Sequence, residues 1–246
     1  MFRSLRTDSK LSAHRNKISV LVTVLAIGLM LAPFSPSAQA DPLFGPIMDY
    51  DSFTKSPFFP ILGTFDYFHL IKMSDLTSGL PMTAPGATAS AGFVDGPGGL
   101  IDSVDGENAG HSLFSGDGTT GITFTFDKAV LGNLPTDVGI AWTDGYVPIH
   151  FSAIDANGNS LGQIDDSTCC DFSSGDGNPA NYRLFYVIDA AGISSIHISN
   201  TGGGIEVDHL QYGFIGPVSG VPEPATFLLL GSALCAVGYR LRRRRS

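Results

Sequence analysis

Acidic side chains are the residues of this 246-residue chain whose types and spacing best suit metal chemistry. Asp102, Asp105 and Glu107 crowd one glycine-rich loop, and Glu206 and Asp208 stand two residues apart in a late run with strand character. Side chains alternate along a strand, so this late pair would share one face. Calcium takes about six to eight oxygen ligands, often from flexible loops. The five residues therefore form a candidate calcium site, and the alternative is that they are turn formers and solvated acids.

Acid–base hydrolysis is the second chemistry that these carboxylates could support. Asp144 follows Trp142 by two residues, which would place a carboxylate beside a ring on which a sugar could stack. A glycosidase needs two carboxylates at a defined separation, and no spacing selects a partner for Asp144 among the other acids. The sequence also has no Gly-x-Ser-x-Gly or His-Glu-x-x-His motif. We therefore interpret Trp142 as a core residue and Asp144 as a turn residue, and keep a secreted, glycosidase-like hydrolase as the alternative function.

The cysteines and histidines indicate no further site. Cys169 and Cys170 are adjacent in a polar loop, and Cys235 lies in an apolar run. A bridge between adjacent cysteines constrains almost no chain, so free thiols or a bridge to another chain fit equally well. No Cys-x-x-Cys pair or zinc-type Cys/His spacing occurs, which argues against zinc.

Short apolar runs separated by turn residues must position these side chains. Ile122–Phe126 alternates strictly between apolar residues and threonine, Val138–Trp142 is continuously apolar, and Tyr182–Ile188 is apolar on both faces. Asn157-Gly158 favours a tight hairpin turn, and Asp127–Leu131 a single helical turn. Strands at this spacing predict an all-β fold, an antiparallel jelly-roll-like β-sandwich. Residues 41–92 are aromatic but interrupted by proline, so their elements are not predicted.

The N-terminal 40 residues have the pattern of a secretory signal peptide. A basic lead precedes an apolar stretch over residues 18–32, and Ala38-Gln39-Ala40 supplies the small-x-small pattern of a cleavage site. The sequence predicts a signal helix in residues 1–40, cleavage after Ala40, and the Sec translocon and signal peptidase as partners.

The C-terminal residues have the pattern of a weak transmembrane helix. Residues 225–239 carry no formal charge, and residues 240–246 contain five arginines. Fifteen helical residues span roughly 22 Å, short of a hydrocarbon core of about 30 Å. The arginines place the C-terminal end in the cytoplasm. We expect a folded domain over 41–216, a linker and tail over 217–246, and a transient inner-membrane intermediate.

Removing both ends leaves a strongly acidic chain. Residues 41–239 hold four basic residues (Lys55, Lys72, Lys128 and Arg183) and 22 acidic ones, a net charge of −18. Nucleic acids and anionic lipids are bound through lysine and arginine, so this charge excludes nucleic acid as a partner. It suits divalent cations, neutral sugars or simple solubility outside the cell.

The C-terminal tail resembles a PEP-CTERM sorting signal. Pro222, Glu223 and Pro224 follow Val221, and the apolar span and the arginine cluster come after them in the family's order. The resemblance implies recognition by an exosortase-type protease, and delivery to the cell surface or an exopolysaccharide matrix of Gram-negative bacteria.

The exported part is similar to a group of PEP-CTERM proteins that have no assigned activity. It departs from them at Asn181-Tyr182-Arg183, where an acidic pair commonly precedes the arginine, and at the Cys169-Cys170 loop. We interpret the exported part as a non-enzymatic binding or matrix-structural module, associated with extracellular polysaccharide. The matching stretches are 111–116, 120–127, 140–145 and 204–213.

Overall fold

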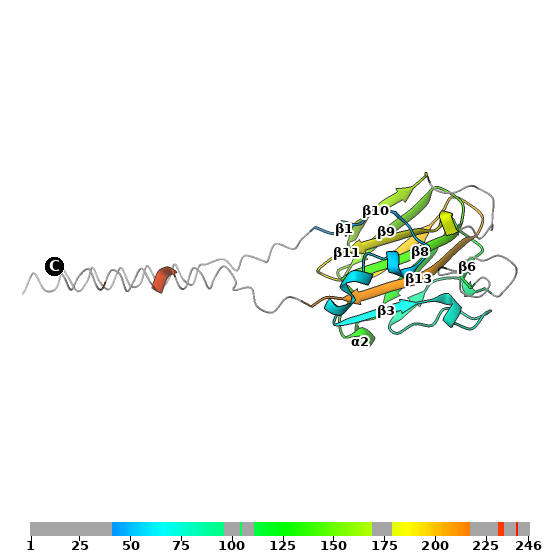
Figure 1. Ribbon diagram of the computed structural model, residues 1–246. Helices are drawn as coiled ribbons and strands as arrows, with labels where there is room; N and C mark the ends of the chain where they lie inside the picture. The colour runs from blue at the N-terminus through cyan, green and yellow to red at the C-terminus, as the bar shows by residue number, and fades with distance from the viewer. Residues whose placement is uncertain are drawn as a thin grey trace, which may run out of the picture. The chain divides into compact units, whose positions relative to one another are not determined.

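The computed structural model describes residues 41–95, 104, 111–168, 179–216, 231–233 and 240 (Figure 1). Residues 41–216 form two antiparallel β-sheets that face each other, which confirms the predicted all-β antiparallel sandwich. None of the helices in the described ranges has the length and apolarity to cross a bilayer. The predicted signal peptide and nearly all of the predicted C-terminal span lie outside these ranges, and both stay predictions.

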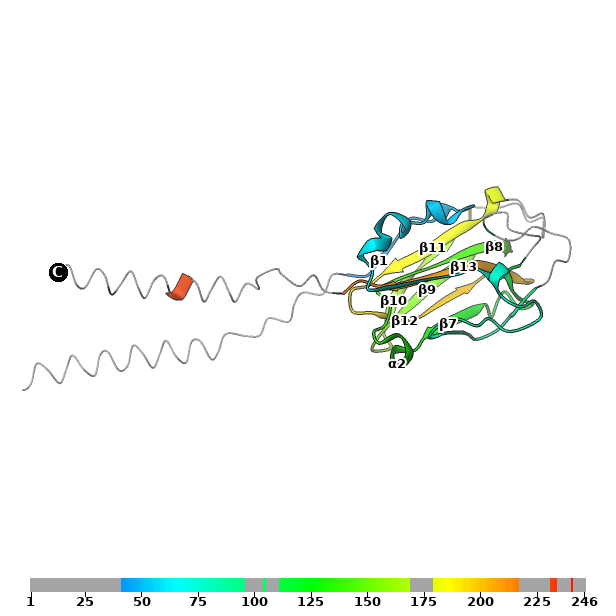
Figure 2. The same cartoon turned by 60° about the horizontal axis from the view of Figure 1, so that its bottom comes forward.

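The larger sheet has the strand order β1-β11-β8-β13-β6-β5, with β2 also paired to β11 and β3 to β13 (Figure 2). Its strands are β1 (Leu43–Phe44), β2 (Met48–Asp49), β3 (Tyr67–Ile71), β5 (Phe93–Val94), β6 (Leu113–Ser115), β8 (Asp137–Gly145), β11 (Arg183–Ile188) and β13 (Ile205–Phe214).

The smaller sheet has the order β10-β9-β12-β7-β4. Its strands are β4 (Ala87–Ala89), β7 (Ile122–Phe126), β9 (Ile149–Asp155), β10 (Ser160–Asp166) and β12 (Ile193–Ser199). From β6 to β13 the chain alternates between the two sheets, except that β9 and β10 follow each other in the smaller sheet. The central strands consequently read β6-β13-β8-β11 in one sheet and β7-β12-β9-β10 in the other.

Local sequence signals account for several element boundaries. The alternating run Ile122–Phe126 is β7 with the predicted bounds, and Gly158 supplies the positive φ of +84° in the turn between β9 and β10. The predicted single helical turn is α2 (Lys128–Leu131). The Asp127 side chain caps this turn by accepting a hydrogen bond from the Ala129 backbone N–H at 2.8 Å.

The main hydrophobic core lies between the two sheets. Trp142 on β8 is only 2% exposed and packs in this core, as the sequence predicted. On β7 the three apolar side chains point inward, and on β13 Ile205, Val207 and Leu210 do so. Burial of these side chains is the main favourable contribution to the stability of the sandwich.

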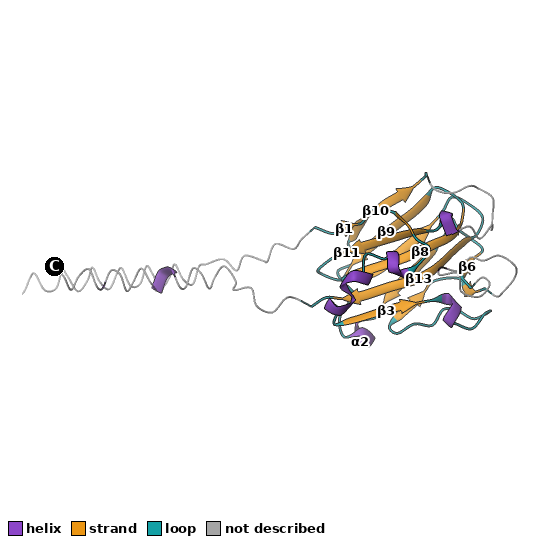
Figure 3. Ribbon diagram, viewed as in Figure 1, coloured by secondary structure: helices purple, strands orange, loops and turns teal. Residues whose placement is uncertain are grey.

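A second apolar layer covers the outer face of the larger sheet. The N-terminal segment crosses this face with two 3₁₀ helices, η1 (Phe53–Lys55) and η2 (Phe59–Thr64), drawn in purple in Figure 3. A third, η3 (Met73–Asp75), follows β3, and its Met73 packs in the main core. Tyr50 and Phe58 are fully buried and pack against Tyr182, Leu184 and Tyr186. The proline-interrupted aromatic segment, for which the sequence predicted no regular element, therefore builds an outer layer on the sheet.

A β-bulge in β13 turns polar side chains toward this outer layer. His209 has a φ of +49°, and the pairing with β8 shifts register between Asp208 and Gln211. The Tyr50 hydroxyl lies 3.0 Å from His209 Nδ1 and accepts from Gln211 Nε2 at 2.9 Å. Gln211 Oε1 in turn accepts from Ser56 Oγ at 2.5 Å. The network ties the N-terminal segment to β13, because buried polar groups are stable only when hydrogen-bonded.

Candidate functional site

A small cavity lies where β8 ends and β13 begins. Asp144 on β8 and Glu206 on β13 are directly opposite each other in the antiparallel pairing. Both carboxylates line a cavity of about 240 Å³. The other lining residues are Phe114, Gly145, Tyr146, Gly203 and Gly204.

Two aromatic rings form walls of the cavity and rest on glycine backbone. A Cβ atom on Gly204 would lie 2.6 Å from a ring carbon of Phe114, and one on Gly203 would lie 2.2 Å from a ring carbon of Tyr146. Any larger residue would displace these rings. The Phe114 ring also makes an edge-to-face contact with Phe93 at 5.7 Å between centroids, a favoured arrangement for aromatic pairs.

The two carboxylates are held by short hydrogen bonds. Asp144 Oδ1 accepts from the Gly145 backbone N–H at 2.7 Å, and Glu206 Oε2 accepts from Ser112 Oγ at 2.9 Å. The Ser112 backbone N–H donates to Asp95 Oδ1 at 2.8 Å. Ionised carboxylates are acceptors only, so the cavity presents oxygen atoms that suit hydroxyl groups or cations.

Hydrogen bonds fix the loop after β12, which supplies two of the glycines that line the cavity. Asn200 Nδ2 donates to the Gly204 carbonyl at 2.8 Å, and the Gly202 N–H donates to Asn200 Oδ1 at 3.2 Å. The Gly118 N–H donates to the Gly203 carbonyl at 2.6 Å. These bonds orient the glycines before any ligand arrives, which lowers the entropy cost of binding.

The predicted calcium ligands of β13 have different surroundings. Ile205 and Val207 point into the core, so Glu206 and Asp208 leave the strand on the opposite face, as alternation predicted. Asp208 is 1% exposed and does not line the cavity. Its Oδ1 accepts from the N–H groups of Met73 and His209, at 2.9 and 2.7 Å. Its Oδ2 accepts from the Val104 N–H at 3.0 Å.

Asp208 is therefore a structural clamp between β13, η3 and residue 104. The other predicted ligands Asp102, Asp105 and Glu107 lie outside the described residues. Among the residues that are described, no group of three His, Cys, Asp or Glu side chains is arranged to hold a metal ion. The calcium site stays a prediction, and Cys169 and Cys170 also lie outside the described ranges.

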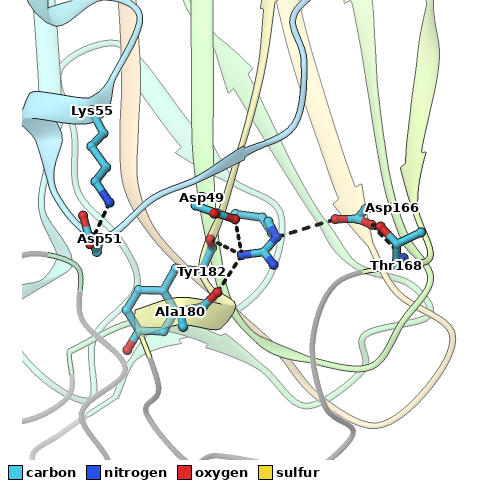
Figure 4. A network of polar contacts seen from close by, with 8 residues as sticks. Asp49, Asp51, Lys55, Asp166, Thr168, Ala180 and Tyr182 are labelled. Atoms are coloured by element: carbon cyan, nitrogen blue, oxygen red, sulfur yellow. Dashed lines mark hydrogen bonds and ion pairs between the residues drawn. The ribbon is translucent and has the colours of Figure 1, made fainter.

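Arg183, at the start of β11, connects the N-terminal segment to the larger sheet through Asp49 of β2 (Figure 4). Its Nη1 lies 2.9 Å from Asp49 Oδ1 and donates to the carbonyls of Ala180 and Tyr182 at 2.8 and 2.9 Å. Its Nε lies 3.8 Å from Asp166 Oδ2. The contact with exposed Asp49 contributes little by itself, whereas the bonds to backbone fix the start of β11.

The remaining histidines have structural surroundings. His197 Nδ1 lies 3.0 Å from Thr123 Oγ1, and His150 Nδ1 lies 2.7 Å from Asp165 Oδ1. Burial lowers the pKa of His197 and of His69 below the usual range, because an imidazolium loses hydration there. The hydrogen bond from His150 lowers the pKa of Asp165.

Sequence reasoning missed most of the cavity. It interpreted Asp144 as a turn residue, whereas Asp144 belongs to β8 and lies opposite Glu206 on the neighbouring strand β13. Phe114, Tyr146 and the glycines were not selected at all. The run Gly202-Gly203-Gly204 was the one available signal, because consecutive glycines mark a place where other groups approach the backbone closely.

Comparison with known proteins identifies the C-terminal tail. A family model described as the PEP-CTERM protein-sorting motif matches residues 220–245. Neither the curated proteins nor the solved structures contain a match to the chain. The match confirms the sorting signal around Pro222, Glu223 and Pro224, and it implies export and processing by an exosortase. This chain therefore carries a PEP-CTERM sorting motif and has the features of an exosortase substrate.

Proposed function

We propose that the exported domain is a non-enzymatic binding module for extracellular polysaccharide, with one neutral sugar unit held in the Asp144–Glu206 cavity. The observation that carries this proposal is the pair of opposite carboxylates that line one cavity together with two aromatic rings and three glycines. Adjacent sugar hydroxyls donate to carboxylate oxygens, and the apolar face of a sugar ring packs on an aromatic ring.

The dimensions and charge of the cavity fit this ligand. At about 240 Å³ the cavity is slightly smaller than drug-sized pockets, which begin at about 300 Å³, so a single ring is the natural occupant. A phosphorylated or sulfated ligand would meet two carboxylates at close range and be repelled. Neutral hydroxyls meet no such penalty.

We also propose that the sandwich is of the jelly-roll type. The strand orders β6-β13-β8-β11 and β7-β12-β9-β10 support this, because each sheet pairs early strands with late ones as two Greek keys do. Lectin domains use the same architecture, although a fold by itself assigns no ligand.

The route to the cell surface is the remaining part of the proposal. The PEP-CTERM motif supports handling by the secretion machinery and by an exosortase-type protease at the inner membrane. We propose that signal peptidase removes residues 1–40 and that the span over 225–239 holds the chain transiently. The domain then reaches the cell surface or the extracellular polysaccharide matrix.

One observation favours a second function, a secreted glycosidase-like hydrolase. Directly opposite residues in antiparallel strands have Cβ atoms about 4.5–5.5 Å apart. The carboxyl groups of retaining glycosidases are about 5–5.5 Å apart. The carboxyl carbons lie one bond beyond Cβ in Asp144 and two bonds beyond it in Glu206, so the two groups are near enough to act as such a pair if a sugar bound between them. We propose calcium, held by the predicted acidic loop, as an accessory to either function.

A glycan array separates these functions when it is probed with the full exported chain in calcium and in chelator. Binding without turnover supports the module, and it should be lost in Gly204→Ala, whose Cβ would displace Phe114. Gly202→Ala is the matched control, because its Cβ would meet nothing within 4 Å. Hydrolysis that disappears in Glu206→Gln would establish the enzyme, and retention that needs calcium would support the predicted ion.

A further inference from the structure

Both ends of the folded chain lie at one end of the larger sheet. The registers align Leu43 with Ile188, Ile188 with Asp137, and Asp137 with Gly213, so these residues form one row across β1, β11, β8 and β13. Three strand spacings separate Leu43 from Gly213, or roughly 14 Å. We call this end of the sandwich the terminal end.

The Asp144–Glu206 cavity lies at the other end. β8 runs from Asp137 at the terminal end to Gly145, which is paired with Ile205 at the start of β13. Eight residue steps of a strand span about 26 Å. Figure 2 shows β8 and β13 extending along the length of the sandwich between these ends.

The terminal end is held close to the C-terminal apolar segment by a short length of chain. Nine residue steps lead from Gly216, the last residue described before the tail, to Ala225 at the start of that segment. An extended chain of this length reaches at most about 30 Å. While residues 225–239 remain in a bilayer, the terminal end therefore stays within that distance of the membrane.

Exposed apolar side chains are present at this same end. Phe59, in η2, is 43% exposed. Two contacts directly after η2 place it at this end: the Phe65 ring lies over Gly213, and the Asp66 N–H donates to the Phe214 carbonyl at 2.8 Å. The α2 turn lies there too, because β8 begins a few residues after it. Of the exposed large apolar side chains, four belong to elements at this end, and we call them together the terminal apolar surface: Leu43, Phe59, Ile61 and Val130.

We propose that the terminal apolar surface contacts the lipid interface of the membrane in which the C-terminal segment is held. The inference rests on the tethering part of the proposed function but not on its ligand. Residues 41–239 carry a charge of −18, so attraction to anionic lipid cannot supply the contact and apolar insertion must. A weak apolar contact suffices, because the tether makes it intramolecular. The cavity is then presented away from the bilayer before the tail is cut.

Tryptophan quenching by brominated lipid tests this orientation in the full chain, reconstituted into zwitterionic phosphatidylcholine–phosphatidylethanolamine vesicles. Phe59→Trp places a reporter at the terminal end, and Tyr146→Trp places one at the cavity end. The two sites are matched, because Phe59 is 43% exposed and Tyr146 is 42% exposed. The unsubstituted chain supplies the background of Trp142, which is buried at 2% exposure.

We expect quenching of Phe59→Trp and none of Tyr146→Trp. Adding Leu43→Ser and Ile61→Ser to Phe59→Trp should remove most of that quenching if the side chains themselves make the contact. Equal quenching at both ends, quenching only at the cavity end, or none at either would overturn the proposal. Flotation of the chain with the vesicles reports the tether separately, so its failure is distinguished from failure of the orientation and of glycan binding.

Discussion

Asp208→Asn separates a structural clamp from a calcium ligand at one predicted site residue. The carboxylate accepts three backbone N–H bonds, at 2.9 Å from Met73, 2.7 Å from His209 and 3.0 Å from Val104. An asparagine side chain has nearly the same shape but offers one oxygen and one NH₂ group. If the oxygen stays toward Met73 and His209, the NH₂ group faces the Val104 N–H, and two donors meet in a buried site.

The cost follows from these contacts. Losing one hydrogen bond to a charged group costs about 1.5–3 kcal/mol, and leaving a buried donor unsatisfied costs about 1–3 kcal/mol more. We expect Asp208→Asn to lower the free energy of unfolding by about 3–5 kcal/mol. For a domain of this size the melting temperature should fall by roughly 10–15 °C.

Urea unfolding of the full exported chain, followed by Trp142 fluorescence, measures this loss. Glu206→Gln is the matched control, because it lies on the same strand and face but borders the cavity, and should change stability by less than about 1 kcal/mol. A clamp predicts the same loss in Asp208→Asn with calcium and with chelator. If chelator abolished the difference between the variant and the natural chain, Asp208 would be a metal ligand and the clamp reasoning would be refuted.

Three further predictions concern the scaffold. Gly158→Ala should cost about 1 kcal/mol of stability, because the φ of Gly158 is +84°. Gly63→Ala is the control and should cost nothing comparable, because Gly63 is equally free of neighbours but has no positive φ. A urea midpoint that Gly158→Ala leaves unchanged would contradict this. Phe58→Ala should destabilise the domain by about 3–5 kcal/mol by emptying the outer layer, and limited proteolysis should then cut the N-terminal segment first. Burial lowers the pKa of His197, so the unfolded chain takes up a proton on this residue at a higher pH than the folded chain does. The stability that neutral His197 contributes is therefore present above about pH 6.5 and is lost as the pH falls toward the lowered pKa. His197→Gln should consequently reduce the drop in urea midpoint between about pH 7 and about pH 5. An equal drop in both chains would assign the pH dependence to other groups.

Local patterns predicted the elements that depend on local physics. The alternation of Ile122–Phe126 fixes which face of β7 is buried, and Asn157-Gly158 can form the tight turn without strain. The N-terminal segment was not predictable in this way. Its buried side chains Tyr50 and Phe58 depend on Tyr182 and Tyr186, which are remote in sequence and come close only after β11 joins the sheet.

The candidate site was missed for a similar reason. Nothing in the neighbourhood of Asp144 indicates Glu206, because the pairing of β8 with β13 includes two register shifts that sequence patterns do not determine. The bulge at His209 has the same consequence for Asp208. Simple alternation placed it correctly on the outer face, but only the structure shows that its oxygens are occupied by backbone donors.

The two-residue strands β1 and β2 have a consequence for solubility at a crowded surface. Both pair with β11, whose far side is joined to β8, and so they cover four of the six residues of what would otherwise be an open sheet edge. Uncovered edges of this kind add strands from neighbouring molecules and start aggregation. Because β1 begins at Leu43, a cut of the predicted leader a few residues beyond Ala40 would remove part of this edge protection. Cleavage at the predicted site, after Ala40, would leave β1 intact and so keep this protection against neighbouring copies.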